Sequence, residues 1–144
     1  MKVKVINKSS YDLPQYATEH SAGLDLKANV DKLIVLKPLE RVMVPTGIFI
    51  ELPDGYEAQI RPRSGLAAKQ GVSLVNTPGT IDPDYRGEIK VILVNLSNDI
   101  VTLNPGERIA QMIVARFERI EWEPVHHLSD SDRGEGGFGS TGLK

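Results

Sequence analysis

The sequence predicts an all-β fold, either a sandwich or a barrel, in a single domain. Runs of strand length that are rich in valine and isoleucine recur throughout its 144 residues. Turn formers separate these runs, and the chain has 9 prolines and 13 glycines in all. Many short strands at close spacing are typical of sandwiches and barrels. A chain of this length can bury one core, and no repeat or internal linker divides it.

Eight segments are predicted to be strands, because each combines β-branched or aromatic residues with a turn signal beside it. In chain order they are residues 2–6, 33–36, 42–44, 47–51, 56–61, 88–95, 100–103 and 109–117. Pro-Asp-Gly at 53–55 and Asn-Pro-Gly at 104–106 are two of the turns that separate them.

The run 109–115 differs from the other strands because it is apolar at almost every position. A strand on the surface would alternate between apolar and polar residues, so this strand is expected to be covered on both faces. Cover by a second subunit and a central place in a sandwich explain the pattern equally well.

Residues 64–71 are expected to form the single short helix. Ser64 suits the N-cap, an alanine-rich stretch follows it, and Gly71 suits the C-terminal stop. The helix would have about two turns.

Composition and charge exclude several classes of protein. The chain has no cysteine, so disulfides and thiolate metal sites are impossible. Its net charge of −2 argues against nonspecific binding to nucleic acid. The N-terminus lacks the apolar run of a signal peptide, and no stretch reaches the roughly 18 apolar residues of a membrane helix. These observations predict a cytoplasmic protein without a nucleic-acid or membrane partner.

The familiar catalytic and cofactor motifs do not pass their context tests. His20, His126 and His127 have no third residue at metal-ligand spacing and are expected on the surface. Residues 137–142 match the spacing of a dinucleotide fingerprint, but no strand precedes them. A P-loop beginning at residue 134 would need a lysine at the position of Ser140.

Residues 61–65, Arg-Pro-Arg-Ser-Gly, place two guanidinium groups beside the expected helix start. Guanidinium groups match phosphate oxygens, and free N–H groups at a helix start attract anions. A phosphate site and an ordinary helix start with solvated arginines explain this cluster equally well.

Residues 76–87 are rich in turn formers and place a carboxylate, Asp82, three positions before a phenol, Tyr85. Taken by itself, this string predicts a hairpin in which the aspartate caps the turn.

Residues 129–144 differ in composition from the rest of the chain. They contain five glycines, with Phe138 and Leu143 as the sizeable apolar groups. Such a segment cannot offset its ordering entropy by burial, so it is expected to be a flexible arm. A single aromatic ring among glycines also suits a segment that folds over a flat ligand.

Five segments spread over the chain carry the clearest signal. They are AGLDLKA (22–28), RSGLA (63–67), GTIDPDYRG (79–87), GERIAQ (106–111) and RGEGGFGSTG (133–142). In this order they resemble the five motifs of the trimeric dUTPase family, and residues 13–18 are also typical of that family. Each motif alone is weakly specific, but together they span nearly the whole chain.

The resemblance implies a jelly-roll-like, distorted β-barrel subunit with one short helix that assembles as a homotrimer. The β-domain would comprise residues 1–128. A flexible glycine-rich arm, residues 129–144, would close over an active site that is built by other subunits. A trimer and its exchanged arm would explain both the covered strand and the glycine-rich tail.

The reaction that the resemblance implies is hydrolysis of dUTP to dUMP and pyrophosphate by attack of water on the α-phosphorus. This reaction keeps uracil out of DNA and supplies dUMP for thymidylate synthesis. Asp82 would hold and deprotonate the water, a role typically worth about 10²–10⁴ in rate. The cofactor Mg²⁺ would be held by the substrate phosphates and by water, with no direct protein ligand. Asp25 would orient such a water or an arginine.

The resemblance also assigns contacts with the substrate. Phosphates would meet Arg63, Ser64, Gly65, Gln111 and Arg133, and Gly139 and Ser140 would add backbone and hydroxyl contacts. Uracil would be read by Asn76 and by the backbone of Thr80, Ile81 and Asp82, and it would stack on Phe138. Tyr85 would pack against the C2′ edge of the sugar, and Lys90 would lie beside the nucleotide.

Two other functions compete with this interpretation. A dCTP deaminase of the same fold would have a glutamate-centred site, whereas this chain has Asp82 followed by Tyr85. A noncatalytic binding protein would be expected to lack Asp82 or the arm, and the sequence has both.

Overall fold

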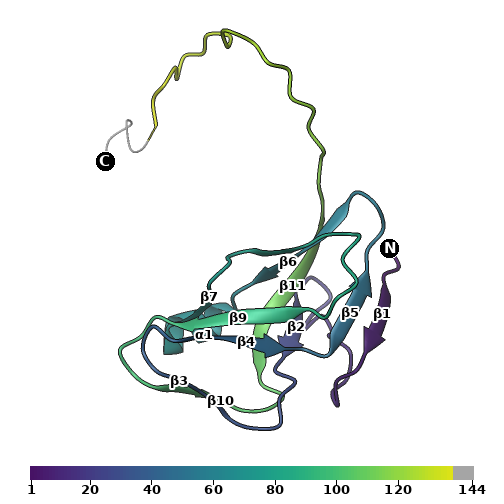
Figure 1. Cartoon of the computed structure of the whole chain (residues 1–144), viewed down its shortest axis with the longest axis vertical. Helices are drawn as coiled ribbons and strands as arrows, with labels where there is room; N and C mark the ends of the chain where they lie inside the picture. Colours follow the sequence, from purple (N-terminus) through teal and green to yellow (C-terminus); the bar gives the residue numbers. More distant parts are fainter. Residues whose placement is uncertain (138–144) are drawn as a thin grey trace.

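The computed structural model describes residues 1–137, which form eleven strands and one helix (Figure 1). The elements are β1 (Lys4–Asn7), β2 (Leu24–Lys27), β3 (Ile34–Leu36), β4 (Arg41–Pro45), β5 (Ile48–Glu51), β6 (Tyr56–Arg61), α1 (Ser64–Gln70), β7 (Val72–Leu74), β8 (Gly79–Ile81), β9 (Lys90–Asn95), β10 (Val101–Leu103) and β11 (Arg108–Arg116). The prediction of an all-β fold with one short helix is confirmed.

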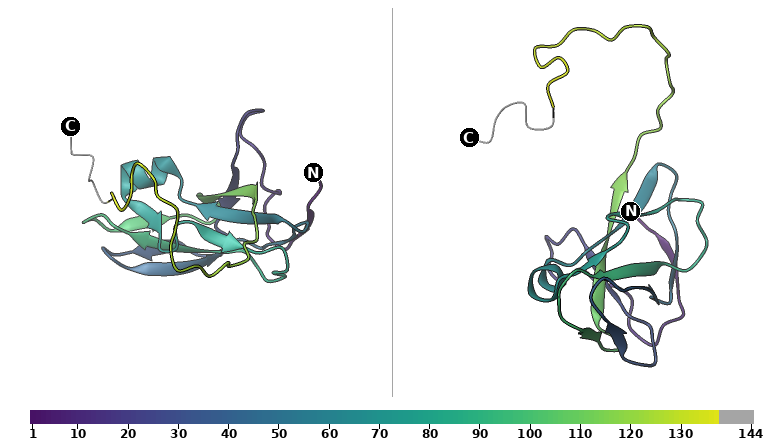
Figure 2. Two further views of the ribbon diagram at one scale, coloured as in Figure 1. Left: turned by 90° about the horizontal axis from the view of Figure 1, so that it is seen from above. Right: turned by 60° about the vertical axis from the view of Figure 1, so that its left-hand side comes forward.

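The strands form four antiparallel sheets around one core (Figures 1 and 2). The largest sheet has the order β2-β11-β6-β8, and a second has the order β4-β9-β7. Two further pairs, β1-β5 and β3-β10, complete the arrangement. Because most paired strands are distant in sequence, the chain crosses between sheets repeatedly, as in a jelly-roll-like fold.

The core is built by the alternation of strand residues. In β9, Val91 and Leu93 are buried, whereas the residues between them are partly open. Asn95 continues the buried side, and its amide is fully satisfied: Nδ2 donates to the carbonyls of Leu36 (2.9 Å) and Asp99 (2.7 Å). These hydrogen bonds offset the desolvation of the buried amide and tie β9 to β3 of another sheet and to the loop before β10.

Three strands escaped prediction: β2, β7 and β8. Each has only three or four residues, and each is extended because it pairs with a longer strand that is distant in sequence. The first strand also begins two residues later than expected. Local propensity is too weak over so few residues to reveal such strands.

The helix begins differently from the prediction. Ser64 is the first helical residue, and the N-cap is Arg63, which is extended (φ −91°, ψ 128°) and makes no side-chain capping bond. The prediction of Ser64 as N-cap is therefore wrong by one position. Gly71 ends the helix as predicted, with a left-handed φ of 66° and its N–H bonded to the carbonyl of Ala67.

β11 lies in the interior of the largest sheet, between β2 and β6. Ile109 and Ala110 are neighbours in sequence and are both buried, so both faces of the strand are covered there. Ile113 and Ala115 are only half-buried within one chain. A central position thus explains the first part of the apolar run, and one face of the second part stays partly open.

Beyond β11 the chain runs away from the body of the protein (Figures 1 and 2). Trp122 is 83% exposed and Leu128 is 87% exposed in this segment. The division into a domain of residues 1–128 and an arm of residues 129–144 stays a prediction. Among residues 1–137, no helix is long and apolar enough to cross a membrane.

Candidate active site

Seven of the fifteen predicted site residues line two separate clefts. The first, here called the β8–β9 cleft, has a volume of about 570 Å³. Its lining residues are Met43, Thr80, Ile81, Asp82, Tyr85, Gly87, Glu88, Lys90 and Ile92. The second, called the helix cleft, has a volume of about 440 Å³ and is lined by Gln59, Arg61, Pro62, Ser64, Ala67, Thr77, Pro78 and Gln111. The two clefts share no lining residue.

A braced loop places Asp82 and Tyr85 in the β8–β9 cleft. The Tyr85 N–H donates to the Asp82 carbonyl at 3.2 Å, which closes a turn. The Arg86 guanidinium donates to the Pro83 carbonyl at 2.6 Å across the same turn. This loop leads from β8, which pairs with β6, to β9, which pairs with β4 and β7. The hairpin predicted from this string is therefore wrong, because the chain changes sheets here.

Asp82 is exposed and follows the last residue of β8 directly. Within residues 1–137, its carboxylate has no hydrogen-bond or ion-pair partner in the protein. A carboxylate held on a braced loop at the edge of a cleft can bind a water molecule and accept a proton from it.

β8 itself is an edge strand in the described part of the fold. It pairs with β6 along one side, with Thr80 opposite Gln59 and Ile81 opposite Ala58. The backbone N–H and C=O groups on its other side have no strand partner among residues 1–137, and Thr80 and Ile81 of this strand line the cleft. An edge strand of this kind presents a fixed pattern of donors and acceptors to a ligand.

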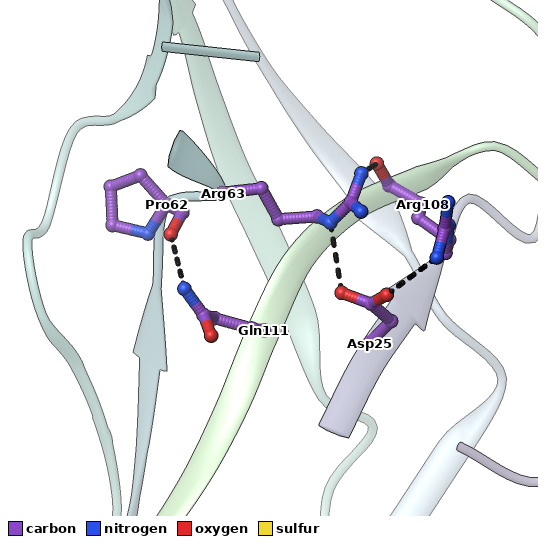
Figure 3. A network of polar contacts seen from close by, with 5 residues as sticks. All are labelled: Asp25, Pro62, Arg63, Arg108 and Gln111. Carbon is purple, nitrogen blue, oxygen red and sulfur yellow. Dashed lines mark hydrogen bonds and ion pairs between the residues drawn. The ribbon is translucent and has the colours of Figure 1, made fainter. Parts of the chain in front are cut away.

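A charged network lies at the other end of the large sheet (Figure 3). Asp25 of β2 accepts a hydrogen bond from Nε of Arg63 at 2.8 Å, and its second oxygen accepts from Nη1 of Arg108 at 3.0 Å. Arg63 also donates to the backbone carbonyl of Arg108 at 3.2 Å. The Asp25 side chain is 23% exposed and the Arg63 side chain 26% exposed, so the pair is half-buried. Asp25 therefore orients Arg63 at the helix start and Arg108 at the start of β11.

Arg108 had no assigned role in the sequence analysis, although it lies within a quoted motif. The sequence feature that could have identified it is its place in the same motif as Gln111, which adds a further arginine to the predicted phosphate site. Strand pairing brings Gln111 opposite Asp25, and this register carries Arg108 to the same carboxylate.

Gln111 is held close to the helix start. Its Nε2 donates to the Pro62 carbonyl at 2.9 Å, as Figure 3 shows. Gly23 lies directly against it, since a methyl group added there would approach the Gln111 side-chain Cδ to 3.3 Å. Ser64 and Gly65 are exposed at the beginning of α1, next to these groups.

The remaining predicted residues are distributed as follows. Asn76 is exposed and lies beside Gly79 at the start of β8. Lys90 opens β9 and lies 4.0 Å from the Glu88 carboxylate. Arg133 is exposed beyond β11 and donates to the Gly136 carbonyl at 2.6 Å. The predicted contacts of Phe138, Gly139 and Ser140 lie outside the described residues. His20, His126 and His127 are exposed, as predicted.

Other ionisable groups add little to the two clefts. Among residues 1–137, no group of three or more His, Asp or Glu side chains could hold a metal ion. Outside both clefts, a hydrogen bond from the Lys4 ammonium lowers the pKa of the Glu51 carboxyl.

The fold and the clefts together define a class of protein. It is an all-β enzyme in which arginines near a helix start can bind phosphate, and a carboxylate that has no partner within residues 1–137 can activate water. These are the parts that hydrolysis of a phosphate anhydride requires.

Comparisons with known proteins agree with this class and narrow it. The family model described as dUTPase matches residues 9–142. The deoxyuridine 5'-triphosphate nucleotidohydrolase of Finegoldia magna is 57% identical over 99% of this chain and 99% of its own length. That of Cytophaga hutchinsonii is 59% identical over 97% of this chain and 91% of its own. The chain therefore belongs to the dUTPase family.

A solved structure supports the same conclusion for the fold. The dUTPase of Staphylococcus bacteriophage 80alpha, in complex with dUPNHPP, superposes with a TM-score of 0.88. The match covers 99% of both chains at 25% sequence identity. The jelly-roll-like arrangement expected from the sequence is thus confirmed.

Proposed function

We propose that this protein hydrolyses dUTP to dUMP and pyrophosphate, with Asp82 as the general base. Besides membership of the dUTPase family, the observation that carries this proposal is the position of Asp82. Its carboxylate lies in the β8–β9 cleft, on a braced loop, with no partner within residues 1–137. It is therefore available to hold the water that attacks the α-phosphorus and to accept its proton.

The uracil ring is recognised at the edge of β8. Uracil presents two carbonyl acceptors and one N–H donor on the edge that an extended backbone can reach. Asn76 and the backbone of Thr80 and Ile81 supply the matching groups. Cytosine has an acceptor in place of that donor, so it leaves polar groups unpaired at a cost of about 1–3 kcal/mol each. Tyr85 borders the same cleft and excludes a ribose hydroxyl from the C2′ edge.

The phosphates bind at the helix start, where Arg63, Ser64, Gly65 and Gln111 lie together. Mg²⁺ enters with the triphosphate and neutralises part of its charge. The residues present fit a Mg²⁺ ion that is held by the substrate. Asp25 is a single carboxylate, and both of its oxygens accept hydrogen bonds from arginines. Asp25 serves as a positioning residue that keeps the guanidinium groups of Arg63 and Arg108 turned toward the phosphates.

This assignment of Asp25 can be checked with Asp25→Asn. The amide retains the size of the carboxylate but loses its charge and turns N–H groups toward one of the two arginines. We expect kcat/KM for dUTP to fall by about tenfold or more, since one hydrogen bond to a charged group is worth roughly 1.5–3 kcal/mol. Asp31→Asn is the matched control, because Asp31 is exposed and lies outside both clefts. Equal kinetics for the two variants would remove Asp25 from the proposed site.

A complete site needs more than one chain. Of the residues assigned to the base and sugar, Thr80, Ile81, Asp82 and Tyr85 line one cleft. Of those assigned to the phosphates, Ser64 and Gln111 line another, and the two clefts share no lining residue. We therefore infer a homotrimer in which one subunit supplies the β8–β9 cleft and another the helix start. The arm that carries Arg133 closes over this shared site. Because nucleoside triphosphates are cytoplasmic metabolites, the proposed reaction places the enzyme in the cytoplasm.

The test is release of pyrophosphate from dUTP, dCTP, dTTP and UTP, each with Mg²⁺ and with excess chelator. We expect release from dUTP alone, abolished by the chelator. This result would establish the reaction, the choice of base and sugar, and the metal requirement together. Loss of ammonia from dCTP with inert dUTP would replace the proposal by a deaminase. No reaction with any nucleotide would favour a noncatalytic binding protein.

A further inference from the structure

Two contacts with neighbouring residues of the chain, one at the hydroxyl and one at the ring, hold the side chain of Tyr85 in place. Its hydroxyl donates to the backbone carbonyl of Glu88 at 3.0 Å. Its ring lies directly over Gly87, where an added methyl group would be 2.5 Å from Cζ and 2.9 Å from Cε2. The side chain is therefore fixed at both the hydroxyl and the ring, although the residue is 42% exposed.

Glu88 is in turn anchored to the body of the protein. Its carboxylate accepts a hydrogen bond from the N–H of Gly47 at 2.8 Å. Gly47 is buried between β4 and β5. The next residue, Ile89, is also tied to this region, since its carbonyl accepts from the Thr46 hydroxyl at 2.6 Å. The acceptor for the tyrosine hydroxyl is thus fixed relative to the sheets.

The conformation of the backbone does not explain why residue 87 is glycine. Five other glycines among residues 1–137 have a left-handed φ, and Gly87 is not one of them. An alanine could adopt its backbone conformation without strain. The remaining physical reason for a glycine at position 87 is space, because a residue without a side chain leaves room for the Tyr85 ring.

We propose that Gly87 and Glu88 are positioning residues that hold the Tyr85 ring against the C2′ edge of the sugar and so set the preference for deoxyribose over ribose. This inference rests on the proposed hydrolysis of dUTP. A tyrosine at a partly exposed site could turn away and admit a hydroxyl. The hydrogen bond from the Tyr85 hydroxyl to Glu88 and the packing of the ring on Gly87 prevent that motion. The ring is therefore in its discriminating position before the substrate binds.

The first test is the ratio of kcat/KM for dUTP to kcat/KM for UTP in Gly87→Ala. The methyl group must displace the ring, and the partial exposure of Tyr85 allows it to move outward without disturbing the core. We expect the ratio to fall by about tenfold or more, because a site that only loosely excludes a hydroxyl discriminates poorly. A wild-type ratio in folded Gly87→Ala would overturn the proposal.

A double-mutant cycle shows whether Gly87 acts through Tyr85. Tyr85→Ala should lower the ratio, and adding Gly87→Ala in that background should change it no further. An undiminished effect of Gly87→Ala without the ring would assign Gly87 a purely structural role and overturn the proposal. Unchanged selectivity in Tyr85→Ala would instead refute the assigned role of Tyr85. Inert wild-type protein would refute the proposed function itself.

A second pair of variants tests Glu88 independently of Gly87. Glu88→Ala removes the acceptor for the Gly47 N–H and should lower the dUTP-to-UTP ratio. Glu88→Gln retains an acceptor oxygen and should restore it. A wild-type ratio in Glu88→Ala, with folding verified by its melting temperature, would overturn the role of Glu88.

Discussion

Asp82→Asn should lower kcat for dUTP hydrolysis by at least about a hundredfold, the lower end of what a positioned general base contributes. The amide has nearly the shape of the carboxylate, but it cannot accept a proton from the attacking water. Binding of dUTP should change little, because the phosphates and the base are held by other groups. The fold should also be unaffected, since within residues 1–137 the carboxylate makes no hydrogen bond or ion pair.

The turn that carries Asp82 offers a matched control. Asp84 is an exposed carboxylate two residues further on, and it does not line the β8–β9 cleft. Asp84→Asn should hydrolyse dUTP at close to the wild-type rate. Single-turnover measurements at saturating dUTP would separate loss of chemistry from loss of binding. Turnover by Asp82→Asn near that of Asp84→Asn would refute Asp82 as the base.

Deletion of residues 133–144 should preserve the assembly and cripple hydrolysis. The deleted residues that the structure describes, 133–137, are exposed or half-buried and belong to the segment that runs away from the body, so their loss removes none of the core (Figure 1). Without Arg133 and Phe138 the site would stay open to water, and we expect kcat/KM to fall by about 10² or more, as misplacement of a bound substrate commonly costs.

The assembly and the activity of this truncation need separate measurements. Sedimentation would report the oligomeric state, and pyrophosphate release would report hydrolysis. A shorter deletion of Leu143 and Lys144 is the control, because it leaves every predicted contact of the arm in place. A fully active 1–132 chain would contradict closure by the arm, and a monomeric one would show that the arm is needed for assembly.

The sequence predicted the features that depend on local chemistry. The valines and isoleucines of 88–95 predicted a strand, and β9 buries Val91, Leu93 and Asn95 on one face. Gly71 was recognised as a helix stop because a left-handed φ is easy for glycine alone. The turn formers around Asp82 predicted a turn, because their backbone preferences are also local. The prediction of a hairpin there was nevertheless wrong.

The resemblance of five short motifs to one family added what local chemistry does not contain. It named Asp82, Tyr85 and Gln111 as members of one site. The structure places the first two in the β8–β9 cleft and Gln111 in the helix cleft. Spacing along the chain could not reveal this separation, and a site shared between subunits stays a prediction.

By itself, then, the sequence determined that this is an all-β member of the dUTPase family, with eight of the eleven described strands, its helix stop and its candidate base. Only the tertiary structure decided that β2, β7 and β8 are strands, that Arg108 shares Asp25 with Arg63, and that the ring of Tyr85 packs on Gly87. The physical reason is the range of the interactions. Propensities and turn chemistry act over a few residues, whereas strand pairing and side-chain contact join residues that are as much as 83 positions apart.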